Sequence, residues 1–537
     1  MMDIDRYYVQ CEEGESQYDD YDLSETKIVH ARYREPILEI DKGNCYIEAL
    51  PHPRDDNDIV RAYTKTLPGY RFDAVKNMSK LEKMMAVASL RELRFPLPFH
   101  KELERLFFTA LVTSYRARYL MYSENTDVEI VIGNEKKVTH SILNGDSSDS
   151  TNAGFSLIGY SGCGKSSAIS ILVKHYPQVI MHTYEDGSYF TQIVYLVVNC
   201  VPNSNFAALY EGIGDAIDKA LNNIKPVYAK AITSERNLGR KAEKVREFIE
   251  KFGVGMIIFD EIQLIDFSHT RENTFDSLLS LSNRTKTAMA VIGTEDARDA
   301  MFRELRTSRR VGMVLNGNLY CNSKDYFRYL VQQLFHYQWF DEIVEVTQEI
   351  IDVLYDVTKG IVDQLISVYI CMHYEYFNKK KKPVIDGKYI RAVANKYYPG
   401  IQSVLANLES IDTTARLQAI RDFADDKVDA ILDAAKQEQE MQKIMNDTTV
   451  MQDMIRLENV VANIKAMFGE YTDSQIETAY NKVISKKSSD GKSEKEISRL
   501  VLDQLKKNPK RRNKKNGVES PDLEHMRDYV TQNGRCE

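Results

Sequence analysis

The chain has 537 residues, 43% of them hydrophobic and 28% charged, and a formal net charge of -8. This length excludes a peptide hormone or a single small module, and suits two to four domains of about 150 residues. The negative charge gives no overall attraction to polyanions, so nucleic acid would have to bind a locally basic surface. Seven cysteines without a C-x-x-C pair fit a reducing compartment. No stretch approaches the roughly 18 apolar residues of a bilayer span, so we expect a cytoplasmic protein without membrane association.

Two segments are expected in the first 143 residues. Residues 1–72 are predicted to form an acidic, partly ordered arm, because acidic side chains dominate residues 1–27. Residues 73–143 are predicted to form an N-terminal helical region, since apolar residues recur at helical spacing with an interruption at Pro96 and Pro98. The polar stretch NGDSSDSTNAG that follows is typical of a connector.

Residues 144–322 alternate short β-rich runs with helical patterns. The runs lie at 155–158, 194–198, 256–259 and 288–292. This alternation predicts an α/β fold with a parallel sheet between layers of helices. Residues 323–400 have the periodicity of an α-helical lid, and residues 401–537 that of a helical tail with a basic run at 506–515.

The segment GYSGCGKS matches the phosphate-binding pattern G-x-x-x-x-G-K-[ST] between a predicted strand and a predicted helix. Its backbone N–H groups would surround a β-phosphate, Lys165 would reach the β- and γ-phosphates, and Ser166 would ligate Mg²⁺. Cys163 is interpreted as a small loop side chain rather than as a redox switch. The residues expected to bind ATP are Gly159, Tyr160, Ser161, Gly162, Cys163, Gly164, Lys165, Ser166, Ser167 and Asp260.

A second motif, MIIFDE, is an apolar run that ends in two carboxylates. A buried strand would bring Asp260 to the Mg²⁺ ion and Glu261 to the attacking water as a general base. Acids also end strands in many α/β proteins without this role. Thr294 follows the next apolar run, where it would either contact the γ-phosphate or cap a helix.

Three arginines lie near the end of a predicted helix over 296–310, at Arg306, Arg309 and Arg310. Arginines at a helix end usually favour the helix dipole and solvent. In an oligomeric ATPase, an arginine from this position can instead stabilise the charge on a neighbour's γ-phosphate. The residues alone favour the first interpretation.

The combination of GYSGCGKS, MIIFDEIQLI, AVIGT and LRTSRRVG resembles the TnsC/TniB branch of AAA+ ATPases, and most closely the longer TnsC regulators of TnsABC-type transposons. The resemblance covers roughly residues 45–400. It implies an AAA+ P-loop core with an α-helical lid and helical N- and C-terminal extensions, and hydrolysis of ATP with Mg²⁺. It also implies Walker A roles for Lys165 and Ser166, Walker B roles for Asp260 and Glu261, and a sensor role for Thr294. The finger role is implied for one of Arg306, Arg309 and Arg310.

The same resemblance implies partners. In this family the ATP-bound protein forms a ring or helical filament on double-stranded DNA, and links a TnsD/TniQ-like target selector to the TnsA and TnsB transposase. It would act at the bacterial nucleoid, with residues 73–143 contacting the selector and residues 401–537 the transposase. Asp363 stands where many AAA+ proteins carry arginine, so a conventional second sensor is not expected.

Contact with DNA is expected from a basic segment between the second strand and the MIIFDE motif. The alternative is that these basic residues belong to a solvent-exposed helix face on which neighbouring acidic residues balance their charge. Rival functions are another DNA-associated AAA+ ATPase, a STAND-like signalling NTPase and a non-hydrolysing protein-binding scaffold. The expected DNA-contact residues are Lys225, Lys230, Arg236, Arg240, Lys241 and Lys244.

Overall fold

A computed structural model describes residues 27–118, 120–144, 154–183, 189–202, 205–265, 275–294, 313–398, 437, 439–445, 448–468, 471–484 and 494–507. The chain divides into two compact units, Met1–Val450 and Met451–Glu537. Among the residues described, no helix has both the length and the apolar character needed to cross a membrane.

The first unit is built on a five-stranded sheet whose neighbouring strands are all parallel, in the order β10-β4-β9-β8-β7. Most side chains of the three inner strands are buried, which explains why these strands are continuous apolar runs. The four predicted β-rich runs are confirmed as strands, with ends shifted by one residue or less. The strands are β4 (Gly154–Ile158), β7 (Tyr195–Asn199), β8 (Met256–Asp260), β9 (Ala288–Gly293) and β10 (Met313–Asn316).

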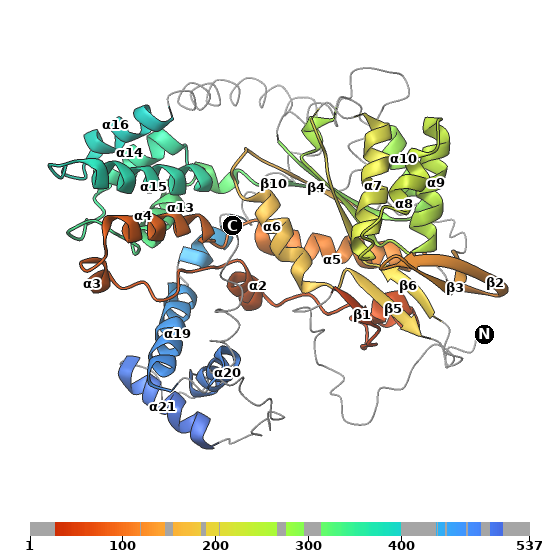
Figure 1. Cartoon of the computed structure of the whole chain (residues 1–537), viewed down its shortest axis with the longest axis horizontal. Helices are drawn as coiled ribbons and strands as arrows, with labels where there is room; N and C mark the ends of the chain where they lie inside the picture. Colours follow the sequence, from red (N-terminus) through yellow and green to blue (C-terminus); the bar gives the residue numbers. More distant parts are fainter. Residues whose placement is uncertain are drawn as a thin grey trace, which may run out of the picture. The chain divides into compact units, whose positions relative to one another are not determined.

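Helices cover the sheet, and α7 to α10 stand together on one side of it (Figure 1). Their apolar faces share one cluster with strands β7, β8 and β9. Helix α5 also packs on the sheet, where it contacts β4, β8 and β9. The helices of this part are α5 (His100–Arg116), α6 (Lys165–Leu172), α7 (Phe206–Ala220), α8 (Tyr228–Thr233), α9 (Leu238–Lys251) and α10 (Phe275–Thr285).

The N-terminal residues from 27 onward pack against this core. Strand β1 extends a small sheet of order β1-β5-β6, and the ring of Tyr46, which is fully buried, stacks on Tyr115 at 4.9 Å. The elements are β1 (Ile28–His30), β5 (Val179–Thr183), β6 (Tyr189–Ile193), α1 (Cys45–Glu48), α2 (Asp56–Ala62), α3 (Phe72–Val75) and α4 (Lys80–Ala88).

The prediction of a helical region over 73–143 is wrong for its last part. Strands β2 (Leu120–Ile132) and β3 (Glu135–Asn144) form an antiparallel hairpin there. Its turn is Gly133-Asn134, and both residues have positive φ, 60° and 65°. Two such residues between alternating apolar runs produce the turn that matches strand twist, so the local turn chemistry decided this segment.

Residues 324–397 form a helical lid, in agreement with the predicted periodicity. Helix α4 of the N-terminal region packs on α15 of the lid, and Lys83 of α4 forms a 3.4 Å ion pair with Asp341, which lies between α13 and α14. The N-terminal region therefore contacts both the sheet and the lid. The lid helices are α13 (Lys324–Leu334), α14 (Gln348–Thr358), α15 (Val362–Asn378) and α16 (Gly387–Tyr397).

The second unit is a small group of helices with its own apolar cluster, which includes Ile464, Tyr480 and Val501. Its helical character agrees with the predicted tail, whereas its boundary at Met451 lies well beyond the expected position of 401. Residues 401–436 and most of the basic run at 506–515 lie outside the described residues. The helices are α19 (Thr448–Met467), which begins just before the boundary, α20 (Asp473–Ile484) and α21 (Glu494–Lys507).

Candidate nucleotide-binding site

The GYSGCGKS segment forms the loop between β4 and α6, as predicted. Gly162 and Gly164 adopt φ values of 83° and 95°, which L side chains rarely adopt. A Cβ on Gly164 would lie 3.0 Å from Cδ1 of Leu97, and one on Gly162 would lie 3.0 Å from Cβ of Asp363. Gly164 also caps the N-terminus of α6. The first N–H groups of α6 therefore point into the loop, where they favour an anion such as phosphate.

Lys165 extends back across this loop. Its ammonium donates to the carbonyl oxygens of Gly159, at 2.7 Å, and Tyr160, at 2.8 Å, and the residue is 7% exposed. Asn318, in the turn after β10, accepts a hydrogen bond from the backbone N–H of Tyr160. The loop is thus held from two neighbouring strands, with the Lys165 ammonium at its centre.

Cys163 lies beneath the loop and is fully buried. Burial raises the pKa of its thiol, so the reactive thiolate is disfavoured. The carbonyl oxygen of Cys163 accepts a hydrogen bond from the hydroxyl of Tyr320 at 3.3 Å. These observations favour the small packing side chain over the redox switch.

Asp260 and Ser166 meet at the end of β8. Burial raises the pKa of Asp260, and the nearby Ser166 hydroxyl and the backbone N–H of Glu261, which donates to Oδ1 of Asp260 at 2.9 Å, oppose that shift. A hydroxyl and a carboxylate oxygen are hard ligands of the kind that Mg²⁺ prefers, and a cation would offset the cost of burying the Asp260 charge. The residues therefore fit the expected Mg²⁺ ion, which Ser166 and Asp260 would hold.

Glu261 follows in the left-handed conformation, with φ 58° and ψ 41°. Its carboxylate accepts a hydrogen bond from Nε2 of Gln263, and Oε1 of Gln263 accepts one from the backbone N–H of Thr294 at 3.1 Å. The Thr294 hydroxyl is buried and has no hydrogen-bond partner among the described residues. The fold thus brings Asp260, Glu261 and Thr294 to one edge of the sheet, and Gln263 is an unpredicted link between two of them.

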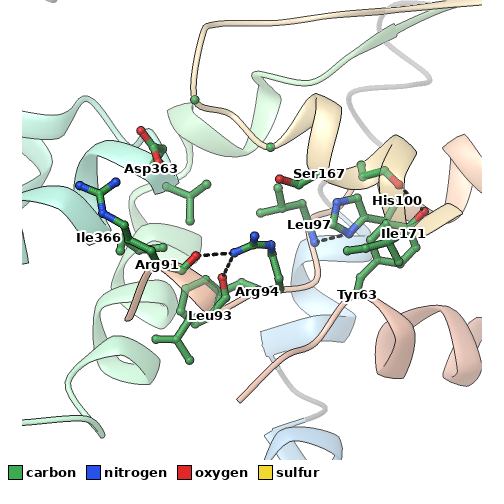
Figure 2. Close-up of a pocket in the computed structure, with 15 residues that line it drawn as sticks. Tyr63, Arg91, Leu93, Arg94, Leu97, His100, Ser167, Ile171, Asp363 and Ile366 are labelled. Carbon is green, nitrogen blue, oxygen red and sulfur yellow. Dashed lines mark hydrogen bonds between the residues drawn. The ribbon is translucent and has the colours of Figure 1, made fainter. Parts of the chain in front are cut away.

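A cavity of about 240 Å³ lies against this loop (Figure 2). One wall is the N-terminal segment, where the Arg94 guanidinium donates to the carbonyl oxygens of Arg91 and Leu93, both at 2.7 Å. The other walls come from the P-loop, from α6 and from the start of α15. The lining residues are Tyr63, Arg91, Leu93, Arg94, Phe95, Leu97, His100, Gly162, Gly164, Ser167, Ala168, Ile171, Val362, Asp363 and Ile366.

The floor of this cavity contains two stacked rings. The Tyr63 and His100 ring centroids are 4.0 Å apart, and Nδ1 of His100 accepts from the Leu97 backbone N–H at 3.0 Å. Burial lowers the pKa of His100 to about 3, so the imidazole is neutral at physiological pH. Sequence reasoning missed the lining residues around Leu97 and His100, because Pro96 and Pro98 were interpreted only as a break between helices.

Asp363 lies beside the P-loop. It lies in the first turn of α15, its side chain lines the cavity, and its backbone N–H donates to the Gly162 carbonyl oxygen at 3.3 Å. An acid therefore faces the P-loop from this turn of the lid. Three other expected residues, Arg306, Arg309 and Arg310, lie outside the described residues.

The six expected DNA-contact residues are spread along the chain from the end of α7 to α9. Lys225 follows the end of α7, whereas Arg236 and Arg240 flank the start of α9. Both helices run antiparallel to the strands and are about 22 Å long, so these positions lie near opposite edges of the sheet. Lys230 is exposed on α8 between them, and the ammonium of Lys244 pairs with Glu247 at 2.8 Å.

Lys241 has to be removed from this set. It is 7% exposed, and its ammonium forms a 2.8 Å ion pair with Glu211. The same ammonium donates to the carbonyl oxygens of Ile232, at 3.0 Å, and Thr233, at 3.3 Å. These carbonyls end α8, so Lys241 acts as a buried cap that joins α8 to α9. The prediction of a DNA contact here is wrong because amphipathic charge in the sequence does not reveal burial.

A family model described as an AAA domain matches residues 149–301, which include the P-loop, Asp260 and Glu261. The chain carries an AAA-type ATPase domain. Together with the five-stranded parallel sheet and its helices, this match establishes the AAA+ P-loop fold that the resemblance implies. No curated protein matches the chain.

Three solved structures are similar to this AAA+ chain. Cdc6p from Pyrobaculum aerophilum is 14% identical at a TM-score of 0.32, and the alignment covers 66% of this chain and 88% of that one. The Aeropyrum pernix ORC1 protein in complex with DNA is 11% identical at a TM-score of 0.30, with coverages of 66% and 78%. The Aeropyrum pernix ORC2 protein in ADPNP-ADP complexes is 13% identical at a TM-score of 0.30, with coverages of 66% and 88%.

Proposed function

We propose that this protein is an ATP-dependent regulator of DNA transposition. The observation that supports ATP chemistry is the meeting of the P-loop with the end of β8, where Lys165 and Ser166 lie close enough to Asp260 to oppose the rise in its pKa that burial causes, and Glu261 follows directly. The four motifs that resemble TnsC proteins support transposition as the process. ATP would act mainly as an assembly switch, because a site completed by a neighbouring subunit couples hydrolysis to the lifetime of the oligomer.

The reaction assigns a distinct task to each side chain. Lys165 would exchange its loop carbonyls for phosphate oxygens of ATP, and the N-terminus of α6 would bind the same anion. Mg²⁺, when bound, neutralises charge that develops on the phosphates. Glu261 would accept the proton of the attacking water, and the unpartnered hydroxyl of Thr294 would donate to the γ-phosphate.

The cavity beside the P-loop would hold the base and ribose. It contacts Gly162, Gly164 and the first turns of α6, so a nucleotide whose phosphates lie in the loop can extend into it. The neutral His100 ring and the apolar side chains of Leu97 and Ile171 suit the face of a purine. Because N-terminal and lid residues both line this cavity, nucleotide binding would couple these two parts of the protein.

Assembly and partners complete the proposal. In the ATP state the subunits would form a ring or filament on double-stranded DNA, with one of Arg306, Arg309 and Arg310 reaching the neighbour's γ-phosphate. Lys225, Lys230, Arg236 and Arg240 are exposed and stay candidates for phosphate contacts. The helical part of residues 73–143 would contact a TnsD/TniQ-like selector. The second unit, which has its own apolar cluster, would contact TnsA and TnsB.

The rival functions differ in what they require of this site. Another DNA-associated AAA+ ATPase or a STAND-like signalling NTPase would use the same residues, so only the partners separate these from a transposition regulator. A non-hydrolysing scaffold needs no carboxylate pair after β8. The presence of Asp260 and Glu261 at the end of β8, with Lys165 and Ser166 of the P-loop near Asp260, favours an active ATPase over the scaffold.

Two variants test the switch. Lys165→Ala should abolish ATP-dependent binding to duplex DNA, whereas Glu261→Gln should preserve binding and prolong the complex. Fluorescence anisotropy with labelled duplex DNA measures both, with ADP and a non-hydrolysable ATP analogue as the two nucleotide arms. Electron microscopy should show rings or filaments with the analogue alone. Equal loss of DNA binding in both variants would contradict the switch, and absence of nucleotide binding by the unmodified protein would favour the scaffold.

A further inference from the structure

Gln263 connects two residues that the proposed ATPase site needs. It lies in the short turn Ile262–Leu264 that follows the Walker B carboxylates. Its amide nitrogen Nε2 donates to the carboxylate of Glu261, and its amide oxygen Oε1 accepts from the backbone N–H of Thr294. Glu261 directly follows β8, and Thr294 directly follows β9, so this one amide joins the ends of two neighbouring strands.

The orientation of the amide follows from its partners. A backbone N–H can only donate, so the group of Gln263 that faces Thr294 must be the carbonyl oxygen Oε1. That choice leaves the NH₂ group to face Glu261, whose carboxylate can only accept when it is ionised. Rotating the amide by half a turn would place two donors together at one end and two acceptors together at the other. Both contacts therefore specify the same orientation.

Glu261 needs such a restraint. Its carboxylate is on an exposed residue with several rotatable bonds, and its backbone is in the left-handed region, which a non-glycine residue rarely occupies. A general base must lie within hydrogen-bond reach of the water that it deprotonates, and a displacement of 1 Å can cost about 100-fold in rate. Within the described residues, the bond from Gln263 is the contact that holds the Glu261 carboxylate in one place.

We propose that Gln263 is a positioning residue that ties the Glu261 carboxylate to the backbone of Thr294, so that the base and the γ-phosphate sensor keep one relative geometry. This inference rests on the proposed ATPase function. If the Thr294 backbone moves on contact with phosphate, its hydrogen bond moves the Gln263 amide, and the second bond of that amide moves the Glu261 carboxylate. The water is therefore activated only when the end of β9 has its phosphate-bound position.

Two substitutions separate the two bonds. Gln263→Glu keeps an oxygen that accepts from Thr294 but loses the donor to Glu261 and adds a like charge. Gln263→Met has a similar length and removes both bonds. We expect each variant to lower kcat for ATP by about 10- to 100-fold, while KM and the Kd for a non-hydrolysable analogue change by less than about twofold. A substitution that weakened binding of ATP and of the transition state equally would instead raise KM and leave kcat unchanged.

The lid offers a matched control. Gln348 is exposed and bridges two partners in the same way, since its Nε2 donates to Asp352 at 2.9 Å and its Oε1 accepts from Arg328 at 3.2 Å. Gln348→Met removes an equivalent bridge far from the P-loop in the sequence and outside the cavity lining. It should leave kcat and KM unchanged.

A double substitution gives the decisive result. In a Glu261→Gln background, single-turnover hydrolysis of radiolabelled ATP should not fall further when Gln263→Met is added, because the group that Gln263 positions is already gone. An independent, equal decrease in that background would overturn the inference, and so would a wild-type kcat in the single variants. If the unmodified protein hydrolyses no ATP with or without duplex DNA, the proposed function itself fails, which is a different outcome.

Discussion

Replacement of Lys241 by methionine tests whether this lysine is a structural cap or part of a DNA-binding surface. Methionine keeps the apolar stem of the side chain and removes only its charge and donors. The ammonium has three acceptors, the carboxylate of Glu211 and the carbonyl oxygens of Ile232 and Thr233. The consequence of Lys241→Met depends on how well water can replace the ammonium at each of them.

The three losses differ in size. Ile232 is fully buried, and its carbonyl oxygen keeps the backbone N–H of Glu235 at 3.1 Å but loses a charged donor that water cannot readily replace, at a cost of about 1.5–3 kcal/mol. Thr233 is exposed and the Glu211 side chain is 35% exposed, so both can be rehydrated, and together they cost about 1 kcal/mol or less. We expect Lys241→Met to destabilise the α8–α9 pair by about 3 kcal/mol.

Hydrogen exchange suits this measurement better than fluorescence. The single tryptophan of the chain is Trp339, which precedes α14 of the lid and does not report on α8. A local loss of about 3 kcal/mol corresponds to a decrease of about 100-fold in the protection of α8 amides, since 1.4 kcal/mol is a factor of about ten. DNA affinity should be measured in parallel by anisotropy at several salt concentrations.

Arg240→Met is the matched control, because Arg240 is exposed one position earlier on the same helix. It should leave amide protection within about 0.5 kcal/mol of the unmodified value, weaken DNA binding and reduce the salt slope by about one. If Lys241→Met keeps full protection on α8 and loses DNA affinity and salt slope as Arg240→Met does, the burial argument is refuted.

The remaining predictions concern the P-loop and acid stability. Gly164→Ala should weaken binding of a fluorescent nucleotide at least about tenfold, because a φ of 95° at the cap of α6 is strained for alanine. Gly69→Ala is the control. Gly69 has a φ of 75° and nothing within 4 Å of an added Cβ, so this substitution imposes similar backbone strain away from the site and should leave nucleotide binding unchanged. Burial lowers the pKa of His100 and His373 to about 3 and that of His182 to about 4. Below a pH of about 6.5 the unfolded chain therefore binds protons that the folded chain does not, and stability should fall by about 2 kcal/mol per histidine at pH 5. A urea midpoint that stays constant from pH 7 to pH 5 would contradict this reasoning.

The parts that sequence reasoning predicted correctly are contiguous in the chain. The P-loop is one run of eight residues, and its pattern specifies both the backbone conformation of Gly164 and the chemistry of Lys165. The parallel strands were equally readable, because burial on both faces requires continuous apolar runs. The place of Asp260 and Glu261 at the end of a buried strand was predictable from such a run.

The errors and omissions arose where partners come from distant segments. The cavity beside the P-loop combines Leu97, Ile171 and Ile366, which no single pattern connects. The amide of Gln263 acquires its role only because β8 and β9 end side by side. The hairpin of β2 and β3 is an exception, since its Gly133-Asn134 turn is a local signal that the prediction of a helical region over 73–143 did not include.

The sequence by itself determined the α/β class, the phosphate-binding loop and the carboxylates that face it, because each depends on local conformation and on the order of residues along one strand or loop. Only the tertiary structure decided which cations are exposed and which are caps, as Lys241 and Arg240 illustrate on one helix. Charge is a property of a residue, but its availability to a partner depends on neighbours contributed by the rest of the fold, and periodicity within a single helix does not contain that information.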